Sequence, residues 1–261
     1  MKMNLVLLLL VLAPPSLLSA GTAEIKMLVT EVVRPSAMKV LKVKAEGAPE
    51  VSVCFYDTAE GALDAKGLIL RVRREHEANA EGEKDLDAVV KRRGGGPAPE
   101  RFKDLKPEED WVGPESMKLS FSIKAENLDE SLVTEVLEGK KQVREALSDQ
   151  QQQFAKACLN LPEGAEVPWK DLRRYGGIAV WKSKRDIGEF QKAAVEYWRL
   201  TPEKGPVVEL LEVSVKVKAD TPEEIKAQAA AFYAAAKGMG LGVPAGASKT
   251  SRVMEVLKPG K

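Results

Sequence analysis

Two arginines stand two positions apart at the end of an apolar stretch. In GLILRVRRE, residues 67–75, Arg71 and Arg73 have the same parity, and the intervening positions are apolar: Leu68, Leu70 and Val72. Because side chains alternate between the two faces of a strand, this pattern predicts a strand with one core face and one charged face. Arg and Lys are the residues that hold phosphate oxygens, so the charged face is a candidate for anion binding.

The same alternation recurs in later segments. Residues 116–127, SMKLSFSIKAEN, place Lys124 on a polar face opposite Leu119, Phe121 and Ile123, and residues 210–218, LLEVSVKVK, place Glu212 and Lys216 opposite a run of valines. A further lysine, Lys91, stands in AVVKRR at residues 88–93. Water on the polar side of an antiparallel sheet would explain such faces. If the sheet instead closes with these faces inward, the cations converge and repel one another unless an anion such as a polyphosphate lies between them.

Helical patterns and loops separate these strands. Residues 129–159 have apolar positions at helical spacing, with Gly139 as a weak point, and residues 221–238 begin with the capping sequence Thr-Pro-Glu-Glu. A third helix is expected near residues 35–44. Two polar segments, 75–84 and 94–116, are interpreted as loops because they are rich in Gly, Pro and charge, and the second is long enough for a lid or an insertion. Together these patterns predict a single-domain α+β fold built around an antiparallel sheet or β-barrel with flanking helices.

Composition limits the possible partners and metal sites. The 261 residues carry 40 Lys and Arg against 39 Asp and Glu, so no overall field favours nucleic acid or an acidic membrane. With His76 as the one histidine, a metal site would need carboxylates and a hard cation. The two cysteines, Cys54 and Cys158, permit either one disulfide or two free thiols.

The N-terminal segment has the layout of a signal peptide. Lys2 precedes the apolar run 5–13, which is followed by two prolines and a small-residue stretch ending at Ala23. A membrane anchor would need about 20 continuous apolar residues, and the prolines interrupt the run earlier. We therefore expect residues 1–23 to be a signal peptide cleaved near 20 to 23, residues 24–261 to be one domain without membrane contact, and the protein to be periplasmic or secreted.

Several motifs resemble a known family. CFYDTAEGALDAKGLILRVRRE, residues 54–75, is similar to the second and third strands of the CYTH, or triphosphate tunnel metalloenzyme, family. Three further segments follow in the order in which they occur in that family. They are AVVKRR for a strand that ends in an inward lysine, VVELLEVSVK for a glutamate-bearing strand, and SKTSR (residues 248–252) for a late Ser-Lys-x-x-Arg. The resemblance covers essentially the whole chain after residue 23 and implies a triphosphate-tunnel-like barrel in a divergent, exported member.

The family's first-strand motif is only partly matched. Glu-x-Glu-x-Lys corresponds best to TAEIK, residues 22–26, in which Glu24 and Lys26 fit and Thr22 replaces the first glutamate. A threonine hydroxyl is a weaker, neutral ligand for a hard cation. The departure leaves open whether the protein is catalytically active.

The resemblance implies roles for individual residues. It implies catalytic roles for Glu24 and Lys26 and a Mg²⁺ or Mn²⁺ ion held by carboxylates, with Glu24 and Glu212 as leading ligands and Glu126 third. The triphosphate-binding residues that it implies are Arg71, Arg73, Lys91, Lys124, Lys249 and Arg252. Asp57 and Thr58 are interpreted as turn residues, and Glu209 as a surface residue because its parity is opposite to that of Glu212.

The expected activity is therefore hydrolysis of an inorganic or organic triphosphate or polyphosphate. A module of the same fold that binds a polyanion without turnover is the first alternative, favoured by the small number of carboxylates predicted around the tunnel, Glu24 and Glu212. A lipocalin-like barrel for an apolar ligand is the second, and the paired arginines argue against it. Adenylate cyclase activity, also found in the family, ranks lower because an exported protein lacks a steady ATP supply.

Overall fold

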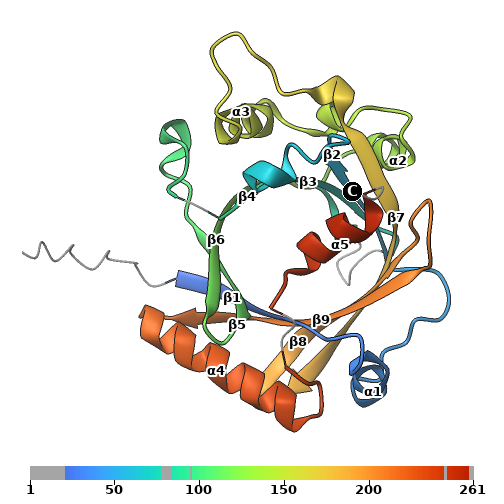
Figure 1. Cartoon of the computed structure of the whole chain (residues 1–261), viewed down its shortest axis with the longest axis vertical. Coiled ribbons are helices and arrows are strands. Elements are labelled where there is room, and N and C mark those ends of the chain that lie inside the picture. The colour runs from blue at the N-terminus through green and yellow to red at the C-terminus, as the bar shows by residue number, and fades with distance from the viewer. Residues whose placement is uncertain (1–20, 78–83, 95, 244–245, 259–261) are drawn as a thin grey trace, which may run out of the picture.

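The structure is a computed structural model that describes residues 21–77, 84–94, 96–243 and 246–258. In these residues nine strands close into a barrel in the order β1-β5-β6-β4-β3-β2-β7-β8-β9 (Figure 1). The strands are β1 (Gly21–Leu28), β2 (Val51–Asp57), β3 (Leu68–Glu75), β4 (Leu86–Arg93), β5 (Glu108–Gly113), β6 (Ser116–Ala125), β7 (Arg173–Ile187), β8 (Phe190–Leu200) and β9 (Val208–Ala219). The predicted α+β barrel is confirmed.

One pair of neighbouring strands is parallel, whereas the sequence predicts an antiparallel barrel. β1 pairs antiparallel with β9 but parallel with β5, and the other neighbours are antiparallel. A ring with an odd number of strands cannot alternate direction all the way round, so the nine described strands require at least one parallel pair. β1 therefore closes the ring as the parallel neighbour of β5.

Three apolar clusters fix which strand faces point into the barrel. Outside β3 and β4, Leu68, Leu70 and Val72 pack with helices α2 (Glu130–Glu138) and α3 (Asp149–Cys158). A second cluster lies under α1 (Arg34–Val40) and α4 (Pro222–Gly238), across β1 and β7 to β9. The third includes Phe55 and Trp198 and packs beneath α5 (Lys249–Leu257), which lies within the outline of the ring in Figure 1. The apolar face of β3 thus faces the helices, and its charged face points inward.

Two of the three predicted helices are present close to their expected positions. Thr221 caps α4: its hydroxyl accepts from the Glu224 backbone N–H, and the Glu224 side chain accepts from the Thr221 backbone. The short α1 occupies the region of the predicted third helix. Both positions follow from local sequence signals.

The prediction of one helix over residues 129–159 is wrong. α2 ends at Glu138 because Gly139 adopts φ 80° in the left-handed region, which lets its N–H bond to the Val136 carbonyl. A short 3-10 helix, Val143–Ala146, follows, and Ser148 then caps α3. Gly139 thus ends α2, and the capping box at Ser148 begins α3, so two α-helices replace the single predicted one.

The segment 94–116, interpreted as a loop, contains a barrel strand. It includes a 3-10 helix at Glu100–Phe102 and then β5, whose Ala23↔Glu109 and Asp110↔Lys118 pairings join β1 to β6. β5 is short and its first residues are acidic, so it lacks the apolar alternation of the other strands. Its position nevertheless makes it part of the tunnel wall.

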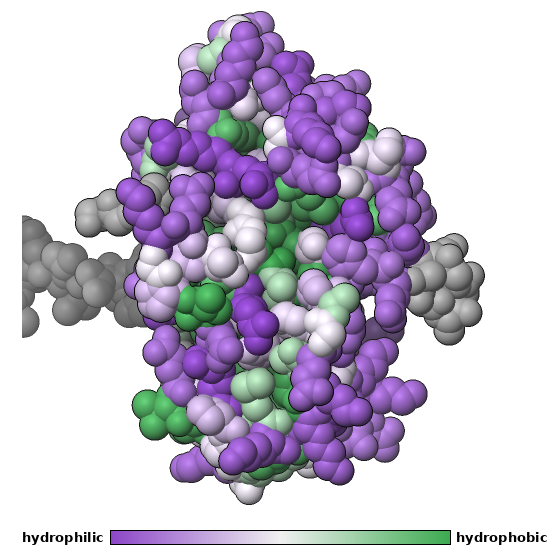
Figure 2. Space-filling model, turned by 90° about the vertical axis from the view of Figure 1, so that its right-hand side faces the viewer, coloured by the Kyte–Doolittle hydropathy of each residue, from purple (hydrophilic) through white to green (hydrophobic). Residues whose placement is uncertain are grey.

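One face of the molecule is mostly polar. The face in Figure 2 is dominated by hydrophilic residues, with hydrophobic ones mainly near its middle. Both cysteines are free thiols.

In the ranges that the structure covers, no helix has the length and apolar character needed to cross a membrane. The expected signal peptide falls outside the described residues up to position 20, whereas 21–23 already belong to β1.

Candidate functional site

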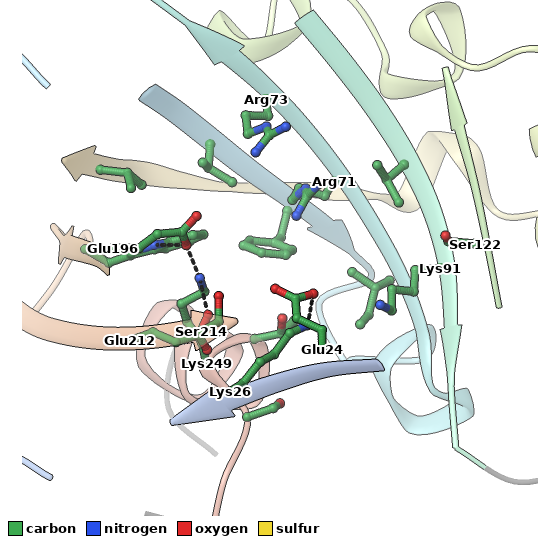
Figure 3. A pocket seen from close by; sticks show the side chains of 18 of the residues that line it. Glu24, Lys26, Arg71, Arg73, Lys91, Ser122, Glu196, Glu212, Ser214 and Lys249 are labelled. Carbon is green, nitrogen blue, oxygen red and sulfur yellow. Dashed lines mark hydrogen bonds and ion pairs between the residues drawn. The ribbon is translucent and has the colours of Figure 1, made fainter. Parts of the chain in front are cut away.

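The barrel encloses a cavity of about 340 Å³ into which charged side chains from most of the strands project (Figure 3). The start of α5 contributes Ser248, Lys249 and Thr250. The basic side chains that line the cavity are Lys26, Arg71, Arg73, Lys91, Arg93, Lys124, Lys182, Lys216 and Lys249. The lining carboxylates are Glu24, Glu108, Glu196 and Glu212. Within the described residues, positive side chains therefore outnumber carboxylates in the lining.

The arginine pair predicted from GLILRVRRE forms one wall. Arg71 and Arg73 are on β3, and the register Arg73↔Asp87 places the buried Asp87 of β4 beside them. Arg73 Nε donates to Asp87 Oδ2 at 2.7 Å, and Arg71 Nη2 lies 3.4 Å from Asp87 Oδ1. Lys124 Nζ lies 3.7 Å from the same carboxylate. Asp87 thus holds three predicted phosphate-binding cations together.

Asp110 of β5 forms a second ionic centre. Its Oδ1 lies 2.7 Å from Lys26 Nζ, and its Oδ2 lies 3.1 Å from Lys91 Nζ and 3.6 Å from Arg93 Nη2. Burial alone would raise the pKa of Asp110, but the charges of Lys26 and Lys91 outweigh it and lower the pKa to about 2. Asp110 therefore stays ionised and fixes the positions of Lys26 and Lys91.

Lys249 forms the third centre, between two carboxylates. Its Nζ is 2.7 Å from Glu212 Oε1 and pairs with Glu196 Oε2. Burial acts to lower the pKa of Lys249, but Glu196 and Glu212 raise it above its ordinary value. Burial similarly acts to raise the pKa of Glu196, and Lys249 lowers it. The group is a charged triad in which the lysine is an ammonium ion.

Most of the predicted residues meet in this cavity. Glu24, Lys26, Arg71, Arg73, Lys91, Lys124, Glu212 and Lys249 all line it. Glu24 pairs with Lys26 at 3.1 Å. In addition, the Nε atoms of Arg71 and Arg93 are buried without a hydrogen-bond partner in the part of the chain that is described. The wall therefore retains unused donor capacity.

Two predicted site residues lie elsewhere. Arg252 projects from α5 to Glu31, at 3.0 Å, and to Glu255, at 2.8 Å, because it is three positions after Lys249 on a helix rather than on an inward strand face. Glu126 follows the last residue of β6 and is exposed, paired with Lys124. Neither lines the cavity. Their placement does not support the roles that the resemblance implies.

The turn and surface interpretations agree with the structure. Asp57 accepts hydrogen bonds from the backbone N–H groups of Thr58, Leu63 and Asp64. Glu209 lies outside the cavity lining and accepts from Tyr197 Oη.

Sequence reasoning missed several lining residues. Arg93, Lys182, Glu108 and Glu196, and Asp110 behind the lining, were not singled out. The parity of Lys91 and Arg93 would have identified Arg93. Glu196 shares its face of β8 with Ala194 and Trp198, a pattern too weak to separate it from a solvated face. The expected count of two well-placed carboxylates is corrected: four line the cavity, and Asp110 and Asp87 support it.

The described carboxylates around the cavity are not arranged as a metal site. Among the described residues, no group of three or more His, Cys, Asp or Glu side chains is arranged to hold a metal ion. Glu24, Asp110, Glu196 and Glu212 each pair with a lysine. Thr22, which replaces a motif glutamate, is exposed and outside the lining. In this arrangement each of these four carboxylates is paired with a basic side chain instead of facing other carboxylates around a shared cation.

Comparison with solved structures identifies the same fold in other proteins. A Hippeastrum protein, studied as an adenylyl cyclase and showing a dominant triphosphatase activity, has a TM-score of 0.51 and 16% identity over 90% of this chain and 95% of its own. A proposed adenylate cyclase from Bacillus halodurans has a TM-score of 0.50 and 15% identity over 89% of this chain and 98% of its own. Family models and curated protein sequences give no match. The barrel fold is therefore shared with these proteins, in agreement with the fold that the motifs predict.

Proposed function

We propose that the protein binds a triphosphate or a short polyphosphate in the barrel and hydrolyses its terminal anhydride. The observation that carries this proposal is the convergence of Arg71, Arg73, Lys91 and Lys124 with Lys26 and Lys249 on one cavity. Low-dielectric walls strengthen the attraction of such a cluster for an anion rich in oxygen. The dominant triphosphatase activity of the Hippeastrum protein supports hydrolysis over cyclisation.

The chemistry assigned to this chain is phosphoryl transfer to water. The bond between the terminal phosphorus and its bridging oxygen breaks and leaves its electron pair on the departing polyphosphate. A water oxygen bonds to that phosphorus, and the proton that the water loses passes to a carboxylate of the cavity and then to solvent. Arg71, Arg73 and Lys91 neutralise the non-bridging oxygens, which is the main requirement of a loose phosphoryl-transfer transition state. We assign the role of proton acceptor to Glu24, which lines the cavity and is partly exposed beside Lys26.

No step is assigned to a metal ion. The resemblance implies Mg²⁺ or Mn²⁺, which would orient the terminal phosphate, but the described carboxylates are paired with lysines and do not form a ligand cluster. The metal dependence of phosphate release is therefore a quantity to be measured.

The test is phosphate release from tripolyphosphate by purified protein with Mg²⁺, with Mn²⁺ and with EDTA. The Arg71→Ala/Arg73→Ala variant removes two cations from the wall and is expected to lower kcat/KM by at least about 100-fold, or ~2.7 kcal/mol. Lys226→Ala is the matched control because Lys226 is an exposed α4 residue paired with Glu115. Circular dichroism establishes that each variant is folded. Unchanged release in the double variant would show that the site is elsewhere.

The alternative is a passive polyanion-binding protein. The pairing of the lining carboxylates with lysines favours it, because a paired carboxylate is a weaker base toward water. Tripolyphosphate binding by calorimetry, without phosphate release under any metal condition, would support this function instead.

A further inference from the structure

Two glutamates face each other directly across neighbouring barrel strands. Glu196 of β8 and Glu212 of β9 are register partners, and both side chains line the cavity. Directly opposed side chains have Cβ atoms about 5 Å apart, and like charges in this position destabilise a sheet. The pair therefore needs a cation between or beside its carboxylates.

Lys249 supplies that cation from a third element. Ser248 caps α5 by accepting from the Ser251 backbone N–H, which fixes Lys249 as the first residue of the helix. The lysine Nζ reaches Glu212 Oε1 at 2.7 Å and also pairs with Glu196 Oε2. Figure 3 shows it pointing toward the two carboxylates.

Trp198 completes the surroundings of the ammonium group. Lys249 Nζ lies 4.3 Å from the centre of the Trp198 ring, an attractive cation–π arrangement. Trp198 Nε1 donates to Glu196 Oε2 at 3.0 Å, so this carboxylate oxygen already accepts from two donors. The ammonium group therefore occupies the space between the two carboxylates and has its own attractive contacts on the carboxylate and aromatic sides.

We propose that Lys249 is a built-in cation that replaces a divalent metal ion between Glu196 and Glu212. The tunnel then binds its triphosphate without first loading a metal at this carboxylate pair. Triphosphate binding without a metal rests on the proposed function, whereas the role of Lys249 concerns only Lys249, Glu196 and Glu212. An ammonium ion on the chain offsets one of the pair's two negative charges without depending on the metal concentration outside the protein.

The test is calorimetric titration of the purified protein with Mn²⁺ alone, which requires neither activity nor triphosphate. Wild-type protein is expected to show no stoichiometric site. Lys249→Met removes the ammonium at similar side-chain length and is expected to strengthen Mn²⁺ binding at least about tenfold. The Lys249→Met/Glu212→Gln variant is expected to lose the gained site.

Lys216→Met is the matched control, because it removes another lining cation that has no ion-pair partner in the described residues. It is expected to create no Mn²⁺ site, which separates a specific exchange of cations from a general change in tunnel charge. Stoichiometric Mn²⁺ binding by the wild type that is lost in Glu212→Gln would overturn the proposal. So would a folded Lys249→Met variant that gains no site. A misfolded Lys249→Met variant leaves the decision to the wild-type and Glu212→Gln titrations.

A parallel titration with tripolyphosphate in EDTA separates the two proposals. The expected result is binding within about twofold of that measured with Mn²⁺. No tripolyphosphate binding under either condition would refute the proposed function, and the Mn²⁺ titrations would still decide the role of Lys249.

Discussion

At the scale of single residues, Asp110 shows how a buried carboxylate organises the basic wall. It contacts Lys26, Lys91 and Arg93 and also accepts from Ser120 Oγ at 3.3 Å. Removing one partner from such a buried group leaves the others uncompensated, which costs more than an exposed ion pair contributes. Asp110 is therefore a positioning residue for Lys26, a predicted catalytic residue, and for Lys91, a predicted phosphate-binding residue.

The lowered pKa of Asp110 predicts a loss of stability in acid. Its pKa is about 2 in the folded protein against an ordinary 3.8, so its stabilising contribution is present above pH 3.8 and is lost as the pH falls toward 2. That contribution is on the order of 2 kcal/mol. Urea unfolding measured between pH 5 and pH 2 should show a shallower pH dependence for Asp110→Asn than for wild type. Equal slopes would contradict the ionic role of Asp110.

Asp110 also shows where sequence reasoning stopped. Arg71 and Arg73 could be predicted because they lie on a strand with clear alternation, so parity alone assigns their face. Lys91 lies in AVVKRR, which does not alternate, and its inward position is implied by the family resemblance. Asp110 lies on the six-residue β5, where Glu108 and Glu109 are both acidic and hide the alternation. The position of β5 depends on long-range pairing with β1 and β6, which no local pattern contains.

At the scale of elements, the break between α2 and α3 depends on one glycine. A Cβ at Gly139 would lie 3.4 Å from Arg174 Nε, and φ 80° is unfavourable for any residue with a Cβ. The apolar spacing over residues 129–159 indicates helix on both sides of the break, but the sequence does not show that this glycine adopts the left-handed conformation. The capping sequence at Thr221, by contrast, defines the start of α4 by local hydrogen bonds.

Gly139→Ala is expected to lower the free energy of unfolding by about 1–2 kcal/mol, because alanine disfavours the left-handed conformation. Gly238→Ala is the matched control: Gly238 is the last residue of α4, its φ is not positive and no atom lies within 4 Å of an added Cβ. This control should stabilise the protein by about 0.5–1 kcal/mol. Urea denaturation of both variants measures the difference, and a destabilised Gly238→Ala would undermine the conformational explanation.

At the scale of the whole molecule, barrel closure bears on the proposed signal cleavage. β1 begins at Gly21, which pairs with Ala219, and Ala23 is fully buried between β5 and β9. Cleavage after Ala23 would remove paired residues from the strand that closes the ring. We therefore propose that the protein is exported and that its mature chain starts at Gly21.

Mass spectrometry of protein recovered from the periplasm or the medium tests this proposal. The expected N-terminal residue is Gly21, because this start retains the whole of β1. A mature chain beginning at Glu24 would show that the barrel closes without the first residues of β1, and retention of residues 1–20 inside the cell would contradict export.

The contrast between a nearly neutral chain and a basic interior predicts selective stabilisation by a polyphosphate. The formal net charge is +1, so an added anion has little general attraction to the protein, whereas the cavity concentrates nine basic side chains among its described lining residues. Tripolyphosphate at 100 times its Kd stabilises the folded state by about 2.7 kcal/mol, which corresponds to a rise in Tm of about 5–10 °C for a domain of this size. Differential scanning fluorimetry in EDTA, with sulfate at equal ionic strength as the control, measures the shift. The rise in Tm should disappear in the Arg71→Ala/Arg73→Ala variant and persist in the Lys226→Ala control. An equal rise with sulfate would mean that the interior does not select a chain of phosphates.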